Sequence, residues 1–142
     1  MKQQKLDLAR REIVGHLERL LEKIQPRFVF YPDGNDSHQD HRKVTEASEI
    51  ALRIYNVNDY VDMVYTYETG STKGFVPNSW FDITEEIERK IEAMMCYESE
   101  TRKGYHPRSV HGIKALAGYR GSQICCKYAE GFKLLRGKHI WQ

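Results

Sequence analysis

The stretch that decides the fold is Arg27-Phe28-Val29-Phe30-Tyr31-Pro32, followed after three intervening residues by Asp36-Ser37-His38-Gln39-Asp40-His41. The first part is an apolar run typical of a buried parallel strand. The second part places two histidines and two carboxylates within six residues, where the strand gives way to a helix. Because ligands of open α/β sheets gather at the carboxyl ends of strands, this junction predicts metal or acid/base chemistry.

Helical and extended patterns alternate on both sides of this junction. Apolar residues recur at helical spacing from Ile13 to Ile24, and Pro26 ends that pattern. A second helix is expected to begin near His38 or Asp40 and to continue to about Tyr55. Residues 61–67 are rich in β-branched and aromatic side chains and predict a second strand.

The rest of the chain predicts two more helices and further extended segments. Residues 80–83 form a brief extended piece, after which Thr84 is the expected N-cap of a helix. Ser109 is expected to cap a later helix that stops near Gly121. Residues 127–136 return as a strand or as a packed tail.

Alternating helices and strands predict an α/β layered domain with helices flanking a parallel sheet. The chain starts with a helix and shows only two or three clear strands, whereas a parallel sheet needs both faces covered. We therefore interpret residues 1–142 as a single, incomplete Rossmann-like domain whose first strands are missing, with a small α+β domain as the alternative. An unpaired edge and an apolar sheet face follow, so the isolated chain is expected to dimerise, to aggregate, or to fold with a partner.

Composition narrows the choice of partners. The 142 residues suit one domain or a large part of one, with 40% hydrophobic and 30% charged residues as in ordinary globular chains. A formal charge of +2 gives no basis for binding nucleic acid or anionic membranes, and no apolar stretch approaches membrane-spanning length. The number of cysteines is odd, and two of the three, Cys96, Cys125 and Cys126, are adjacent, a pattern that does not suit disulfide pairing. Together with the lack of a signal peptide, this predicts a location in the reducing cytoplasm.

The histidine cluster has two interpretations when judged by spacing alone. His38 and His41 are three residues apart, so their rings share one side of a helical first turn. One or both would bind zinc, with Asp36 or Asp40 as a further ligand or as an orienting group behind a ligand ring. A histidine that is not a ligand would donate a hydrogen bond to an oxyanion. In the alternative interpretation, Asp36 or Ser37 merely caps the helix and the histidines are solvated.

Several segments resemble, in the same order, those of the PIG-L/LmbE-like deacetylases. They are Tyr31-Pro32-Asp33-Gly34-Asn35-Asp36-Ser37-His38-Gln39-Asp40-His41-Arg42, Phe75-Val76-Pro77-Asn78-Ser79-Trp80-Phe81-Asp82-Ile83-Thr84, His106-Pro107-Arg108-Ser109, Arg120-Gly121-Ser122-Gln123-Ile124 and Lys127-Tyr128-Ala129-Glu130-Gly131-Phe132. The resemblance covers nearly the whole chain. It implies a Rossmann-like, zinc-dependent hydrolase that removes an N-acetyl group from a sugar amine such as N-acetylglucosamine.

The resemblance also implies roles for individual residues. His41 matches the zinc ligand of the family's second motif, and His38 matches the histidine that polarises the carbonyl or stabilises the oxyanion. Asp40 would be a supporting catalytic carboxylate. Asn78, His106 and Arg108 lie in segments that match the rim of the active site and are candidate substrate-binding residues. For these three, an ordinary surface connection and a capped helix are the alternatives.

One motif of the family is absent from the sequence. Family members carry a His-Pro-Asp-Asp-Glu motif that supplies the other two zinc ligands and the general base, and Tyr31-Pro32-Asp33-Gly34 is only a superficial echo of it. The resemblance therefore implies the C-terminal portion of a deacetylase, inactive alone, that holds zinc only in a complete site. The other half would belong to a longer reading frame or be separately encoded.

A non-catalytic interpretation stays open beside the deacetylase. The chain would then be a pseudo-enzyme or an interaction subunit that keeps the deacetylase shell. A phosphate- or nucleotide-binding domain is disfavoured because no glycine-rich loop follows either strand.

Overall fold

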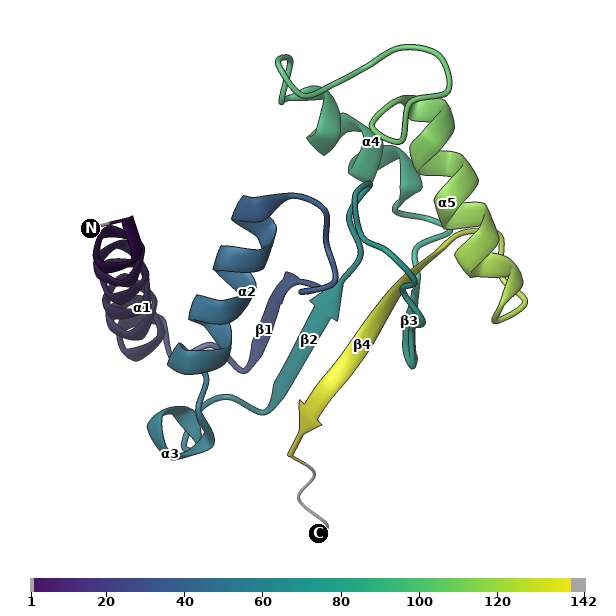
Figure 1. The fold of residues 1–142 in the computed structure, drawn as a ribbon. Coiled ribbons are helices and arrows are strands. Elements are labelled where there is room, and N and C mark those ends of the chain that lie inside the picture. The colour runs from purple at the N-terminus through teal and green to yellow at the C-terminus, as the bar shows by residue number, and fades with distance from the viewer. Residues whose placement is uncertain (1, 139–142) are drawn as a thin grey trace, which may run out of the picture. The chain divides into compact units, whose positions relative to one another are not determined.

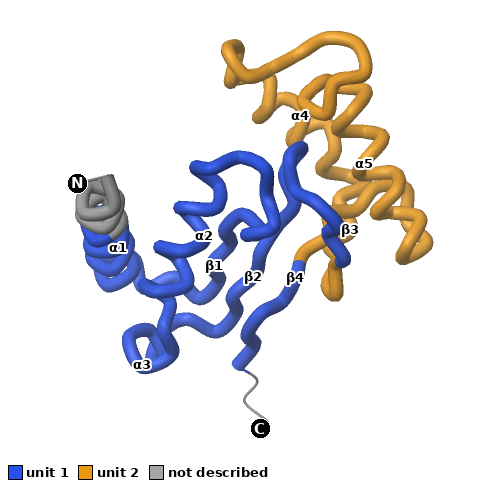
Figure 2. Tube along the Cα trace, viewed as in Figure 1, with its two compact units in different colours: residues 1–76, 133–142 blue, residues 77–132 orange. Residues whose placement is uncertain are grey.

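The computed structural model describes residues 2–138. Its elements are α1 (Lys2–Ile24), β1 (Phe28–Pro32), α2 (Gln39–Ala51), α3 (Ile54–Val57), β2 (Met63–Tyr67), β3 (Ser79–Asp82), α4 (Ile87–Met95), α5 (Val110–Ser122) and β4 (Ala129–Gly137) (Figure 1). The chain divides into two compact units, coloured separately in Figure 2. Unit 1 comprises residues 1–76 and 133–142, and unit 2 comprises residues 77–132.

The four strands follow the order β1-β2-β4-β3 in a mixed sheet. β1 and β2 are parallel, with Phe30 opposite Tyr65. β3 and β4 are antiparallel, with Trp80 opposite Gly131. The α/β prediction is confirmed, but an all-parallel sheet is wrong for the second pair. The sequence of a short apolar run contains no signal for the direction in which it pairs, and nothing in residues 127–136 specifies their partner strand.

The core of unit 1 forms where α2 packs against β1 of the parallel pair and α1 packs against α2. Leu21 of α1, Ala51 of α2, Tyr31 of β1 and Val64 of β2 are buried together. Phe28 alternates with these core residues along β1 and is 51% exposed. An aromatic side chain is thus exposed on the opposite face of the strand, and the missing strands stay a prediction.

The second helix ends earlier than its apolar pattern predicts. The sequence favoured a helix to about Tyr55, but α2 stops at Ala51 and Leu52 is its C-cap, with its amide bonded to the carbonyl of Ser48 at 2.8 Å. Arg53 then takes an extended conformation before the short α3. This break turns the chain so that Leu52 and Val57 both reach the core. The helical spacing of the apolar residues does not reveal such a break.

Unit 2 is built around α4 and α5, whose Ile87, Ile91 and Ala117 are buried together. The predicted N-cap of α5 is confirmed, since the Ser109 hydroxyl accepts a hydrogen bond from the Gly112 amide at 3.1 Å. The predicted cap of α4 is wrong, because α4 starts after Glu86. Thr84 instead lies in the preceding turn, where its amide donates to Asp82 at 2.9 Å.

No helix in the described part of the chain combines the length and the apolarity that crossing a membrane requires.

Candidate active site

The histidine cluster lies where β1 and β2 end. Because these strands are parallel, the segments that follow them emerge at the same edge of the sheet. Backbone hydrogen bonds join the two segments, from the Ser37 amide to the Ser71 carbonyl at 3.1 Å and from the Lys73 amide to the Asn35 carbonyl at 2.8 Å. The loop after β2 is thereby held against the start of α2.

Asp36 is the centre of this junction. Its side chain is fully buried, yet it accepts hydrogen bonds on both oxygens. Oδ1 receives the Ser71 hydroxyl at 2.5 Å and the His38 amide at 2.7 Å. Oδ2 receives the hydroxyls of Thr69 and Thr72 at 2.6 and 3.0 Å and lies 3.0 Å from Nδ1 of His41. With its acceptor positions filled, the carboxylate is suited to orienting a ring and not to binding a metal itself.

The protonation equilibrium of Asp36 reflects the same contacts. Burial acts to raise its pKa. Hydrogen bonds from Ser71, Thr69, the His38 amide and His41 outweigh burial and hold the pKa of Asp36 well below its usual range. The side chain is therefore a carboxylate at any pH near neutrality.

His41 is oriented by this carboxylate. A carboxylate only accepts hydrogen bonds, so in the neutral ring the proton of His41 is on Nδ1, which faces Oδ2 of Asp36. Nε2 then carries a lone pair. The Thr45 hydroxyl lies 2.9 Å from both the His41 and the Pro32 carbonyl oxygens and ties the backbone of the helix to the end of β1.

His38 has the opposite tautomer. It is the N-cap of α2, and its Nδ1 accepts a hydrogen bond from the Asp40 amide at 3.2 Å. The proton of the neutral His38 ring is therefore on Nε2. The carboxylate of Asp40 is exposed and 4.0 Å from Nδ1, so it contributes a nearby charge and no direct hydrogen bond.

The two rings present a donor and a lone pair beside each other. They stack with centroids 4.7 Å apart and an interplanar angle of 26°. Within the described residues, both rings are held through Nδ1 and neither Nε2 takes part in a hydrogen bond. A carbonyl group approaching this edge would meet an N–H of His38 next to the lone pair of His41.

For the zinc ion implied by the resemblance, this site offers one ligand. His41 backed by Asp36 has the chemistry of a single zinc ligand with an orienting carboxylate. Among residues 2–138, however, no three His, Cys, Asp or Glu side chains are arranged to hold a metal ion. These described residues therefore do not form a complete zinc site by themselves.

The Tyr31-Pro32-Asp33-Gly34 echo contributes no further ligand. Tyr31 is buried in the core, and burial, followed by the charge of Glu49, raises its pKa to about 12. Asp33 is also buried and pairs with Lys133 of β4 at 2.8 Å. Burial acts to raise the pKa of Asp33, but the hydrogen bond from Lys133 and that from the Asn35 amide outweigh it and lower the pKa.

Residue spacing did not predict that the loop after β2 holds Asp36. Thr69, Ser71 and Thr72 follow directly after β2, and all three hydroxyls reach the Asp36 carboxylate. A signal was present, because polar side chains at the carboxyl end of a parallel strand are the expected components of a site. Lys133 gave no comparable signal, since 100 residues separate it from Asp33.

Unit 2 contains the three predicted substrate-binding residues. The Asn78 amide donates to the Phe132 carbonyl at 3.0 Å, next to β3. His106 accepts from the Arg108 amide at 3.1 Å, and Arg108 forms an ion pair with Glu100. These local contacts explain their conformations, and their contact with a substrate stays a prediction.

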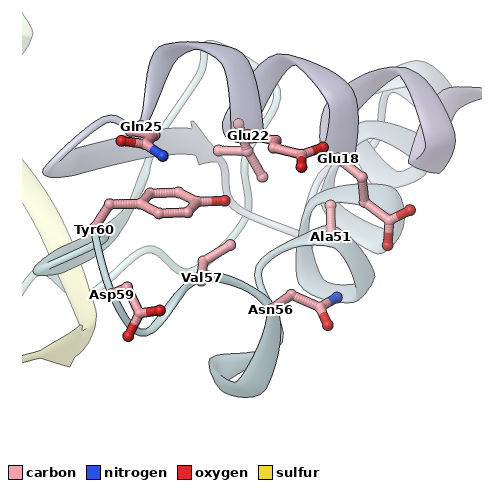
Figure 3. Close-up of a pocket in the computed structure, with 9 residues that line it drawn as sticks. Glu18, Glu22, Gln25, Ala51, Asn56, Val57, Asp59 and Tyr60 are labelled. Atoms are coloured by element: carbon pink, nitrogen blue, oxygen red, sulfur yellow. The ribbon is translucent and has the colours of Figure 1, made fainter.

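A separate pocket of 510 Å³ in unit 1 contains none of the predicted site residues (Figure 3). It lies between α1 and the α3 segment, and its polar lining comprises Glu18, Glu22, Gln25, Asn56, Asp59 and Tyr60. Burial, and then the charges of Glu22 and Asp59, raise the pKa of Tyr60. The pocket carboxylates are exposed, so this hollow has the character of a solvated surface.

Comparison with solved structures identifies proteins of the same fold. The conserved protein TT1542 from Thermus thermophilus matches 92% of this chain with a TM-score of 0.76 and 23% identity. N,N'-diacetylchitobiose deacetylase from Pyrococcus horikoshii matches 89% with a TM-score of 0.69 and 25% identity. GalB, the 4-carboxy-2-hydroxymuconate hydratase from Pseudomonas putida, matches 93% with a TM-score of 0.74 and 20% identity. No protein-family model matches the sequence.

These matches establish a deacetylase-like fold. The chain spans 61%, 52% and 61% of the lengths of the three proteins, respectively. Since one of them is a deacetylase and another a hydratase, the fold alone does not decide the reaction. The choice between reactions has to come from the side chains of the site.

Proposed function

We propose that this chain provides the carbonyl-polarising part of a zinc-dependent N-acyl-sugar deacetylase site. The observation that carries the proposal is the pair of stacked histidines, each held through Nδ1, with both Nε2 atoms open among the described residues. A backbone amide faces Nδ1 of His38 and a carboxylate faces Nδ1 of His41, and these partners assign opposite tautomers to the two neutral rings. Zinc-dependent amide hydrolysis uses a hydrogen-bond donor where negative charge develops on the acyl oxygen, and a Lewis acid that activates the attacking water. His38 would provide the hydrogen-bond donor, and His41 would provide one ligand for the zinc ion.

His38 would contribute through the N–H group at its Nε2 atom. Its Nε2–H would donate to the acyl oxygen, and the hydrogen bond would strengthen as the carbonyl becomes a tetrahedral oxyanion. Removal of one such donor typically costs about 100- to 1,000-fold in kcat. The N-terminus of α2 adds a positive field at the same place, since His38 is its N-cap.

His41 would serve as one zinc ligand, with Asp36 fixing its ring from behind. When bound in a complete site, zinc supplies a water molecule whose pKa is near 7. The remaining ligands and the general base would come from a second segment bearing the family's His-Pro-Asp-Asp-Glu motif. We therefore include such a partner segment, or another chain that supplies it, in the proposal.

The second candidate is a non-catalytic subunit that keeps the deacetylase fold. It is favoured by one specific observation, that no three metal-binding side chains come together among residues 2–138. Zinc bound in a one-to-one ratio by this chain alone, and lost in His41→Ala, would contradict the non-catalytic candidate.

Release of free amine from N,N'-diacetylchitobiose and from N-acetylglucosamine tests the deacetylase proposal. The chain would be assayed with zinc, alone and co-expressed with a segment that carries the His-Pro-Asp-Asp-Glu motif. We expect amine release only from the combination, a loss of about 100-fold or more in His38→Gln, and no loss in His16→Gln. His16 is a matched control because it is an exposed histidine of α1. A combination that folds, binds zinc and releases no amine would contradict deacetylation.

A further inference from the structure

The loop after β2 carries three hydroxyl side chains, Thr69, Ser71 and Thr72, which we call the hydroxyl loop. All three donate to the same buried carboxylate, that of Asp36, at 2.6, 2.5 and 3.0 Å, respectively. A buried carboxylate with two oxygens needs several donors, and here the loop supplies three of them. The contacts bridge more than 30 residues of sequence, so they are not a local capping motif.

The hydroxyl loop is itself rigidly organised around Thr69. The Thr69 amide donates to the Thr72 hydroxyl at 2.8 Å, and the Thr69 hydroxyl accepts from the Ser71 amide at 3.2 Å. Ser71 is also joined to the start of α2 through its carbonyl, which accepts from the Ser37 amide. The hydroxyls are therefore held in a fixed position relative to Asp36.

The position of Asp36 decides which nitrogen of His41 carries the proton. Oδ2 of Asp36 lies 3.0 Å from Nδ1 of His41, and the Thr69 hydroxyl lies 3.4 Å from the same nitrogen. If Asp36 rotated away, Nδ1 would lose the acceptor that keeps its proton there. The ring would then be free to turn and to place its proton on Nε2, where it would block the lone pair.

We propose that the hydroxyl loop is a positioning element for His41, which acts through Asp36 to fix the ring orientation and the Nδ1–H tautomer. Thr69 is its central residue because it contacts Asp36, His41 and both other hydroxyls. None of the three hydroxyls touches a substrate in this role. What the positioned His41 ring is used for rests on the proposed function. The positioning itself can be tested without measuring activity.

Long-range ¹H–¹⁵N correlation NMR of the histidine rings tests the inference on the full chain. In Thr69→Val, the shape is kept and the hydroxyl that helps to hold Asp36 is lost. The ratio of Nδ1–H to Nε2–H tautomer of His41 should fall, by up to about fivefold, the factor that corresponds to one ordinary hydrogen bond. Thr69→Ser should restore the wild-type ratio. Thr101→Val is the matched control, since its hydroxyl donates to the Glu98 carbonyl in unit 2.

Each outcome of this experiment decides the proposal. If Thr69→Val does not fold, the same spectra of Ser71→Ala and Thr72→Val replace it, with the same expected fall. A wild-type tautomer ratio for His41 in the folded hydroxyl-loop variants would overturn the positioning role. Failure of amine release in the assay above, with the tautomer changes as expected, would contradict the proposed function and leave the positioning role intact.

Discussion

Replacing Asp36 by asparagine removes the charge at the centre of the site and keeps its shape. The amide still offers one oxygen, which can face the His38 amide and the Ser71 hydroxyl. Its NH2 group then replaces Oδ2, where it meets Thr69, Thr72 and Nδ1 of His41. The two hydroxyls can rotate to accept. Nδ1 must lose its proton to accept, so Asp36→Asn should also move the proton of His41 to Nε2.

The cost in stability follows from these contacts. A hydrogen bond to a charged group contributes about 1.5–3 kcal/mol, against about 1 for a neutral one. The neutral amide is cheaper to bury and keeps most of its partners, which offsets part of the loss. We expect the free energy of unfolding at pH 7 to fall by about 2–3 kcal/mol in Asp36→Asn. Asp40→Asn, a change at an exposed carboxylate, should stay within about 0.5 kcal/mol.

Urea unfolding as a function of pH gives a second test of the same substitution. A carboxyl whose folded pKa is depressed stabilises the protein fully above its unfolded pKa of about 3.9, and this stabilisation is lost as pH falls through the folded pKa. The difference between wild type and Asp36→Asn should therefore persist at pH 5 and shrink only below about pH 4, as wild type loses the stabilisation from the carboxylate. A difference under about 0.5 kcal/mol at pH 7, or one that does not shrink below about pH 4, would refute this reasoning.

Two further predictions concern α5 and the buried ion pair. A Cβ at Gly112 would lie 2.4 Å from the His106 carbonyl oxygen, so Gly112→Ala should destabilise by about 1–3 kcal/mol in thermal unfolding. Gly118→Ala, with nothing within 4 Å, should stabilise by up to about 1 kcal/mol, and equal effects at both glycines would contradict the close approach. Lys133→Met leaves Asp33 buried without its ion pair, so urea unfolding at pH 7 should show a loss of about 2 kcal/mol. That loss should fall away below about pH 4, because the pKa of Asp33 is lowered in the folded chain, and a pH-independent loss would count against the pair.

The sequence predicted those features that depend on short-range signals. The Ser109 cap, the apolar run of β1 and the placement of both histidines at the start of a helix follow from residues close together in the chain. The features it did not predict depend on residues brought together from a distance. The antiparallel pairing of β3 with β4 and the Asp33–Lys133 pair are of this kind.

The histidine roles show the same division. Spacing places His38 and His41 on one side of a helical turn, and the stacked rings confirm it. Their different tautomers depend on partners that spacing does not reveal, the Asp40 amide for His38 and the buried Asp36 for His41. The fixation of Asp36 depends in turn on a loop more than 30 residues away.

The most direct measurement is the tautomer of each ring in the wild-type chain. Long-range ¹H–¹⁵N correlation NMR at pH 8, above the ordinary imidazole pKa of about 6.5, distinguishes protonated from unprotonated ring nitrogens. We predict that His38 carries its proton on Nε2 and His41 on Nδ1. If both rings carry the proton on the same nitrogen, the donor and the lone pair do not lie side by side, and the site cannot polarise a carbonyl as proposed.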